Sequence, residues 1–383
     1  MDVASALSPL RRVAVTGCGV VSPIGIGREA FAQAFLKGEC GLRPVVGDYV
    51  PPLPCMLASQ VVDFDVTRWL GKKGTRFLDR STMLAIAAAD LALKDGGLAV
   101  DEANAGRIGV VLGTAMGSLK SISDFGRETL LYDRPFLVNP MLFPNTVLNS
   151  AAGQVAIWLK LRGINTTVSN GQLSGLMAVS YAGRAIGLEY ADALLAGGVE
   201  ELSEQLAWGA HHGGNREFLE SAREEDVYPG EGASILLVEE LQAARDRGHP
   251  VIAELLGCES GFYCRTGGDG VAAQARGLAS CLIRLVRACE VSLEEVGALS
   301  AGSPSEVADS VESLAIEMAF GDRRPTRLDV KALIGECYSA AGAFQCVALL
   351  AHLGRPGCSH RYGLVTSAGK DGAVACALFE RGD

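Results

Sequence analysis

Residues 12–25 read RVAVTGCGVVSPIG, an apolar run with two glycines near its middle and a proline near its end. The β-branched residues at its start are typical of a buried strand, and the glycines that follow favour a turn. Beyond the proline, apolar residues recur with helical spacing. The pattern therefore predicts a strand over 12–17, a glycine-rich turn over 17–23 and a helix over 27–38.

Apolar runs and helical patterns alternate along the chain after this first unit. Alternation of this kind is typical of a parallel or mixed sheet that helices cover on both faces. In the first 245 residues we expect helices over 81–94, 118–132, 151–158 and 174–189, and strands over 107–113, 165–168, 193–197 and 233–239.

The same order of elements returns in the C-terminal part of the chain. Strands expected over 250–257, 297–302 and 373–380, with a helix over 271–286, follow the order of their counterparts in the first part. Residues 335–342 enter a helix much as residues 171–175 do. This order indicates a two-fold internal duplication. The division that we expect is a flexible N-terminus (1–10), an N-terminal half (11–245) and a C-terminal half (246–383).

The bulk composition argues against several kinds of protein. With 383 residues, 49% of them hydrophobic, the chain has ample material for a large core. A net charge of −10 argues against a nucleic-acid partner, and no apolar run is long enough to cross a membrane. The eleven cysteines form no CxxC pair and the five histidines lie in no metal motif. We therefore expect no metal and no cofactor, and a reducing cytoplasm as the location.

Several short motifs follow one another in a fixed order over residues 11–379. They are residues 12–25, Gly113-Thr114 with Gly117, Phe143-Pro144 with Asn149 and Ala152-Gly153, residues 196–200, residues 229–233, and Lys331 with Gly335 and residues 341–343. Together they resemble the β-ketoacyl synthases of the thiolase fold. The resemblance implies an α/β fold of two duplicated halves in a five-layered α-β-α-β-α arrangement, which dimerises through one edge of the sheet.

Three side chains carry the chemistry of an active ketosynthase. A cysteine at the N-terminus of a buried helix accepts the acyl group, because the helix-end N–H groups lower its pKa and stabilise the oxyanion. Two histidines support decarboxylation of the malonyl extender. The resemblance places Gln172, Ala301 and Glu336 at these positions, so all three catalytic groups are absent. An amide forms no thioester, and we therefore expect no catalytic residue in this chain.

The pattern is similar to that of the chain-length factor, the second ketosynthase-like subunit of type II polyketide synthases. That subunit also has Gln at the nucleophile position and a residue other than His at the position of Glu336. The resemblance implies a heterodimer, or a dimer of heterodimers, with an active ketosynthase that provides most of the docking to the acyl carrier protein. It also implies a polyketide tunnel along the interface, for which the lining candidates are Met116, Leu119, Ile122 and Phe125.

Other residues near these positions have simpler interpretations. Lys331 matches a family lysine, and we expect it to pair with Glu336 now that the histidines are gone. Cys337 is a second pocket candidate, although a small buried residue is the simpler reading. Ser174 has no histidine nearby to act as its base, which argues against a substitute nucleophile. The acidic pair Asp309 and Glu312 is expected to hold a loop. Residues 366–372 lack the Phe of the family's gating loop, which puts an open pocket in doubt.

Two alternatives to a chain-length factor remain open. One is a malonyl-carrier-protein decarboxylase that makes a starter unit, as some relatives with Gln at this position do. Those relatives need both histidines, whereas Ala301 donates nothing and an anionic Glu336 opposes a developing enolate. The other alternative is a non-enzymatic scaffold that forms a homodimer.

Overall fold

The computed structural model describes residues 10–47, 49, 52–55, 57–131, 133–212, 228–263, 270–303 and 310–382, with the backbone alone for 210–212. Apart from Leu10, the N-terminus expected to be flexible lies outside these residues. The strands are β1 (Val13–Ser22), β2 (Gly25–Ile26), β3 (Arg43–Pro44), β4 (Leu57–Ala58), β5 (Ile108–Gly113), β6 (Asn165–Val168), β7 (Ala193–Glu200), β8 (Gly232–Glu240), β9 (Ala253–Phe262), β10 (Val296–Ser300), β11 (Thr326–Leu328), β12 (Tyr362–Ala368) and β13 (Ala373–Arg381).

The helices connect these strands and cover their faces. The α-helices are α1 (Arg28–Lys37), α2 (Val66–Trp69), α3 (Arg80–Asp95), α4 (Leu119–Leu131), α5 (Ser150–Leu159), α6 (Ser174–Gly187), α7 (Glu204–His212), α9 (Leu241–Asp246), α10 (Gly270–Ala288), α11 (Val311–Phe320), α12 (Lys331–Ile334) and α13 (Ala341–Leu353). The 3₁₀ helices are η2 (Ala105–Arg107), η3 (Pro140–Thr146) and η4 (Tyr338–Ala340).

The main sheet has the strand order β11-β10-β12-β13-β9-β1-β8-β7-β5-β6, with β2 beside β1. Its centre is the antiparallel contact of β1 with β9. Outward from this contact, each half has two antiparallel pairs followed by two parallel pairs. The two halves of the sheet are therefore duplicates, as the sequence predicts. The expected boundary between residues 245 and 246 falls at the end of α9, before β9 begins.

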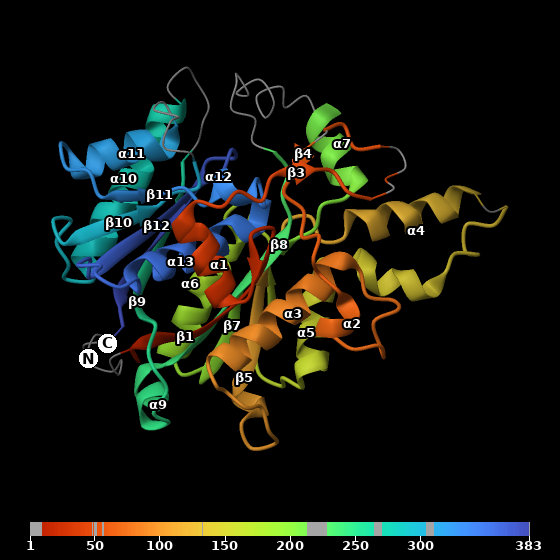
Figure 1. Ribbon diagram of the computed structural model, residues 1–383, viewed down its shortest axis with the longest axis horizontal. Coiled ribbons are helices and arrows are strands. Elements are labelled where there is room, and N and C mark those ends of the chain that lie inside the picture. The colour runs from red at the N-terminus through yellow and green to blue at the C-terminus, as the bar shows by residue number, and fades with distance from the viewer. Residues whose placement is uncertain are drawn as a thin grey trace, which may run out of the picture.

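The helices complete five layers around the two halves of the sheet (Figure 1). The central layer is formed by α6 and α13, which pack against each other and against both halves. Eleven of the thirteen residues of α13 are buried, as expected for a helix that is apolar on nearly every side. Outside them, α3 and α5 cover the N-terminal half, and α10 and α11 cover the C-terminal half. This arrangement is the thiolase-like α-β-α-β-α fold that the sequence predicts.

One local prediction is wrong, because the glycines of residues 17–23 lie inside a strand and not in a turn. Strand β1 continues to Ser22 and pairs with β8 as far as Val21. A Cβ atom added at Gly19 would lie 1.7 Å from the carbonyl oxygen of Ala88 in α3. The glycine therefore allows the backbones of β1 and α3 to come close together. Close approach of another backbone is a known reason for glycine inside a strand.

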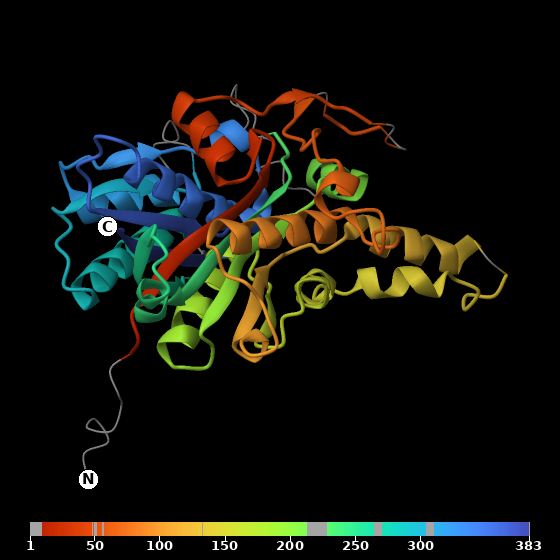
Figure 2. The same ribbon diagram turned by 60° about the horizontal axis from the view of Figure 1, so that its bottom comes forward.

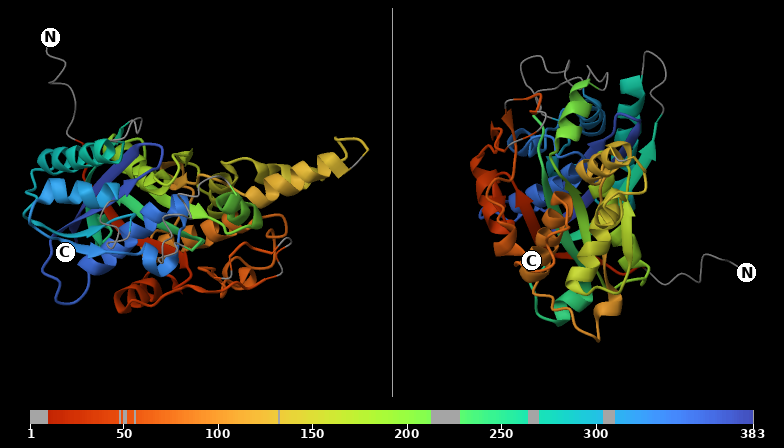
Figure 3. Two further views of the ribbon diagram at one scale, coloured as in Figure 1. Left: turned by 90° about the horizontal axis from the view of Figure 1, so that it is seen from above. Right: turned by 90° about the vertical axis from the view of Figure 1, so that its right-hand side faces the viewer.

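An arm extends away from the body of the molecule (Figures 2 and 3). We define it as α4 and η3, with the described residues between them. The rings of Phe125 and Phe143, with centroids 5.9 Å apart, join its two helical parts. The exposed large apolar residues of the arm are Ile122, Leu130, Leu131, Phe136, Leu137, Met141 and Phe143. Exposed apolar side chains that gather on one segment, as they do on the arm, mark an interaction site.

In the described part of the chain, the arm included, no helix is long and apolar enough to cross a membrane.

The close contact at Gly19 gives a test of the fold. Because a methyl group there would overlap the Ala88 carbonyl, Gly19→Ala is expected to lower the free energy of unfolding by about 3 kcal/mol. The control is Gly106→Ala, where an added Cβ meets no atom within 4 Å and the change should stay within about 0.5 kcal/mol. Urea denaturation of both variants makes the comparison. Equal stability of the two variants would contradict the packing described for β1 and α3.

Candidate functional site

The turn before α6 presents the residue that stands at the nucleophile position. Gln172 is half-buried and lies two residues before the first helical residue, Ser174. The Ser174 hydroxyl donates to the carbonyl of Gly171 (2.6 Å) and accepts from the backbone N–H of Asn170 (2.8 Å). Ser174 is completely buried, so its hydroxyl is committed to closing the turn. This geometry agrees with the expectation that Ser174 is no substitute nucleophile.

Glu336 joins the parts of the site. Its side chain is buried, with 2% of the residue exposed, and one carboxylate oxygen forms an ion pair with the ammonium group of Lys331. The same oxygen accepts from Nε2 of Gln172 (3.3 Å), and the other accepts from the backbone N–H of Tyr338 (2.7 Å). A buried carboxylate needs such partners to offset the loss of water. The ion pair predicted between Lys331 and Glu336 is confirmed.

The contact with Glu336 also fixes the orientation of the Gln172 amide. A carboxylate only accepts hydrogen bonds, so the NH₂ group of Gln172 must face it. The amide carbonyl then lies on the other side of the side chain. The turn before α6 therefore presents a neutral amide that a carboxylate holds in place.

A pocket of about 440 Å³ lies in front of Gln172. Its walls come from the turn before α4, the turn before α6, α7, η4 and the loop between β12 and β13. The lining residues are Ala115, Met116, Leu119, Gly171, Gln172, Gln205, Leu206, Gly209, Tyr338, Gly369, Lys370 and Asp371. None of these described residues is Cys, Ser or His. The pocket is present in this structure even though residues 366–372 lack the Phe of the family's gating loop.

Two of the four tunnel candidates, Met116 and Leu119, line this pocket. Ile122 and Phe125 lie farther along α4, on the arm, and are not part of the lining. Cys337 is also outside the lining, because its thiol is buried and donates to the carbonyl of Ile334 (3.5 Å). Burial first, and then the charge of Glu336, raise the pKa of this thiol well above its usual value. Neither pocket candidate, Cys337 nor Lys331, is part of the lining of this pocket.

Ala301, the third position that the family resemblance singles out, follows β10 directly. It is completely buried and belongs to the core cluster formed with side chains of α10 and α11. Next to it, Glu312 accepts from the backbone N–H of Gly302 (2.9 Å) and from the hydroxyl of Thr366 (2.7 Å). Burial raises the pKa of Glu312. Glu312 thus holds a loop as expected, whereas Asp309 lies outside the described residues.

Sequence reasoning missed a tyrosine and a buried acid that shape the pocket. Tyr338 lines the pocket and has a φ of 45°, which is unusual for a residue other than glycine. Its neighbour Ser339 donates to Glu200 (2.6 Å), at the end of β7. The same oxygen of Glu200 accepts from the backbone N–H groups of Ala115 (2.7 Å) and Met116 (3.1 Å). Burial raises the pKa of Glu200. The Tyr338-Ser339 pair was visible in the sequence only as a motif, with no indication of these contacts.

A second buried acid follows directly. Glu201 accepts from the backbone N–H of Ser81 and the hydroxyl of Ser118, both at 3.0 Å. Burial, and then the charge of Asp79, raise the pKa of Glu201 to about 7. Glu200 and Glu201 therefore anchor the segment that carries Met116 and Leu119 to the end of β7.

Fold and site together define a thiolase-like framework with a pocket whose described lining contains no cysteine. Residues 10–244 match the model of the β-ketoacyl synthase N-terminal domain, and residues 253–356 match that of the C-terminal domain. The chain belongs to the β-ketoacyl synthase family.

Curated relatives include enzymes that carry the family's condensing activity in their names. The chain is 32% identical over 353 residues to 3-oxoacyl-[acyl-carrier-protein] synthase 2 of Coxiella burnetii, which covers 88% of this chain and 84% of the relative. It is 31% identical over 354 residues to the protein of the same name in Vibrio cholerae, with the same coverage of both chains.

Solved structures give a second set of similarities. The ishigamide ketosynthase/chain length factor is similar with a TM-score of 0.81 and 32% identity, over 97% of this chain and 99% of that chain. A type II polyketide synthase acyl-carrier protein in complex with its ketosynthase gives a TM-score of 0.79 at 24% identity, over 98% of this chain and 100% of that chain. At that identity the second likeness shows the fold alone.

The ion pair of Glu336 gives a test of the site. Lys331→Met leaves a buried carboxylate without its cation and is expected to lower the free energy of unfolding by about 3 kcal/mol. In the double variant Lys331→Met/Glu336→Gln the uncompensated carboxylate charge is gone, so the free energy of unfolding should recover much of this loss. Urea denaturation measures both variants. The control is Lys94→Met, which removes an exposed ion pair with Asp90 and should change stability by less than about 0.5 kcal/mol. A loss at Lys331 no larger than at Lys94 would refute the account of Glu336.

Proposed function

We propose that this chain is the non-condensing, ketosynthase-like subunit of a type II polyketide synthase. In this role it is a chain-length factor, which pairs with an active ketosynthase and limits the length of the polyketide. The observation that carries the proposal is the contact of Gln172 with the ion-paired Glu336. Acyl transfer needs a nucleophile near the N-terminus of α6, and an amide that donates to a carboxylate offers none. The site is therefore occupied by groups that stabilise one another.

The condensing activity named for the relatives does not transfer easily to this chain. Acyl transfer requires a thiol or hydroxyl with a base in reach. The pocket lining, as far as it is described, holds no Cys, Ser or His, and burial raises the pKa of its tyrosine, Tyr338, which makes that hydroxyl a poor nucleophile. The hydroxyl nearest in sequence, that of Ser174, is committed to the turn. We infer that the chain has kept the fold and the pocket while losing condensation.

Starter-making decarboxylation has less support from the same geometry. The step creates an enolate, which needs a hydrogen-bond donor or a cation close to its oxygen. The ammonium group of Lys331 is engaged by Glu336, and Ala301 has no polar side chain. The carboxylate of Glu336 would raise the energy of an anion formed next to it. These groups favour a partner role over decarboxylation.

The arm supports a protein partner. Leu130 is 86% exposed and Phe136 is 71% exposed, so large side chains face water along the arm. Leu119 is both the first residue of α4 and part of the pocket lining, which puts the pocket at the base of the arm. A subunit that covered the arm would therefore stand beside the pocket. The similarity at 32% identity to a structure that names a ketosynthase with a chain length factor supports an active ketosynthase as that subunit.

Co-expression with a ketosynthase encoded nearby tests the proposal. The two chains are expected to co-purify as a stable complex, and the doubly substituted variant Phe136→Asp/Leu137→Asp should lose most of it, because two charges would be buried in an apolar interface. Met318→Asp, at an exposed apolar residue of α11, is the matched control and should retain the complex.

Two outcomes would overturn the assignment. One is a chain that is stable alone and fails to co-purify with the ketosynthase, which would favour the scaffold homodimer. The other is release of CO₂ from malonyl carrier protein by the isolated chain, abolished by Gln172→Ala, which would favour the starter-making decarboxylase.

Product length tests the role of the pocket. Leu119→Trp adds bulk to the lining and is expected to shorten the main product by at least one extender unit in the reconstituted complex. Ile157→Trp, at an exposed residue of α5 outside the lining, should leave the product unchanged. Mass spectrometry of the products makes the comparison. An unchanged product from an intact Leu119→Trp complex would remove this pocket from the path of the growing chain.

A further inference from the structure

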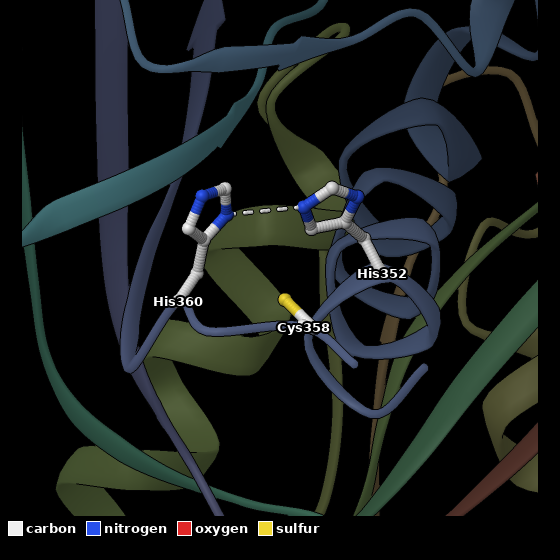
Figure 4. A group of neighbouring side chains, drawn as sticks. All are labelled: His352, Cys358 and His360. Carbon is white, nitrogen blue, oxygen red and sulfur yellow. Dashed lines mark hydrogen bonds between the residues drawn. The ribbon is translucent and has the colours of Figure 1, made fainter. Parts of the chain in front are cut away.

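Two histidines and a cysteine gather at the far end of α13 (Figure 4). His352 lies in the last turn of α13, and Cys358 and His360 lie in the loop that leads to β12. One potential ligand atom from each residue lies within 4.8 Å of the other two. Because α13 rises about 1.5 Å per residue, this cluster is roughly 20 Å from the end of the helix that faces Glu336. It is therefore separate from the pocket at Gln172.

A tight turn brings Cys358 back to the helix. The backbone N–H of Cys358 donates to the carbonyl of Arg355 (3.1 Å), with Pro356 and Gly357 between them. Gly357 has a φ of 78°. Proline followed by a residue of positive φ is the signature of a type II turn, which is a rigid connection. The carbonyl of Cys358 also accepts from the guanidinium group of Arg381, so the turn is anchored to β13.

The two imidazole rings are held by their surroundings. Nε2 of His352 and Nδ1 of His360 are 3.2 Å apart, and the rings stack with centroids 5.4 Å apart. A Cβ atom at Gly297 would lie 2.4 Å from the ring of His360, so the missing side chain makes room for that ring. His352 is 2% exposed, so its ring is packed on nearly every side.

These distances are close to those of a metal centre. Zinc binds imidazole nitrogen at about 2.0–2.1 Å and thiolate sulfur at about 2.3 Å, which puts tetrahedral ligand atoms about 3.3–3.6 Å apart. The two nitrogens, 3.2 Å apart, are within about 0.1 Å of this spacing. All three ligand atoms lie within 4.8 Å of one another, so they must close by roughly 1 Å at most around an ion.

We propose that His352, Cys358 and His360 form a binding site for Zn²⁺, with one coordination position left for water. A thiolate with two imidazoles favours zinc and similar transition metals over Mg²⁺ and Ca²⁺. The ion would link the C-terminal end of α13 to the loop before β12, and the site does not depend on the proposed function.

Access and charge are compatible with an ion at this place. His360 borders one surface hollow of about 440 Å³, and Cys358 borders another of about 1220 Å³, so the cluster can be reached from two sides. Arg361 shares the loop, but its charge is offset by an ion pair with Glu380. The thiolate of Cys358 would neutralise part of the charge of the ion itself.

Metal analysis of the full-length chain as purified tests the site. We expect one zinc per chain, and, after exchange with Co²⁺, a cobalt–thiolate charge-transfer band together with tetrahedral d–d bands. Cys358→Ser should abolish the charge-transfer band and weaken Zn²⁺ binding by about 100-fold or more, since even groups behind the ligands contribute 10- to 100-fold. Cys40→Ser removes an exposed thiol elsewhere and should change neither result.

A second variant keeps the test decisive if Cys358→Ser folds poorly. His360→Ala leaves Gly297 and the buried His352 in place, and Zn²⁺ should raise the thermal midpoint of the wild-type chain but not that of this variant. A wild-type chain that shows no cobalt–thiolate band and no thermal response to Zn²⁺ would overturn the proposal. The proposal would also be overturned if Cys358→Ser and Cys40→Ser lost the cobalt–thiolate band and Zn²⁺ affinity to the same extent.

Discussion

The buried carboxylate of Glu336 is the constraint on which the site depends. An anion with 2% exposure must find its hydrogen bonds and its countercharge inside the protein, and here it finds Lys331, Gln172 and the backbone of Tyr338. Each contact has a structural consequence. Lys331 is held at the start of α12, the amide of Gln172 is oriented, and the backbone at Tyr338 is bonded where its φ is positive. Glu336 is thus a point of structural support for the three segments that it contacts.

The duplicated fold explains how these groups meet. Gln172 stands just before α6 in the first half, and Glu336 stands before η4 and α13 at the equivalent place in the second half. Because α6 and α13 pack together as the central layer, the turns that precede them are neighbours. The pocket forms there, and its remaining walls come from loops and from α7. The arm begins at the same place, which is why a partner on the arm would be a neighbour of the pocket.

The sequence predicted the order of elements and the duplication, because these follow from periodicity and from spacing along the chain. The Lys331–Glu336 pair was expected from the resemblance of Lys331 to a family lysine and from the opposite charges of the two residues. The sequence pattern misplaced a turn at residues 17–23, since a glycine that admits a neighbouring backbone looks the same locally as one that bends the chain. The family resemblance named Ile122 and Phe125 together with Met116, but it does not reveal that α4 leaves the body and carries these two residues away from the pocket lining. The cluster of His352, Cys358 and His360 escaped notice because it depends on a turn and on the close approach of β10 at Gly297.

The central claim is that this chain accepts no acyl group. Intact-mass spectrometry tests it on the complex with the ketosynthase, after incubation with an acyl carrier protein that bears an acyl thioester. The ketosynthase serves as the internal positive control and should gain the mass of the acyl group. The account predicts that the mass of this chain stays unchanged. A stable acyl adduct on this chain, mapped to the peptide that contains Gln172 and Ser174, would contradict it.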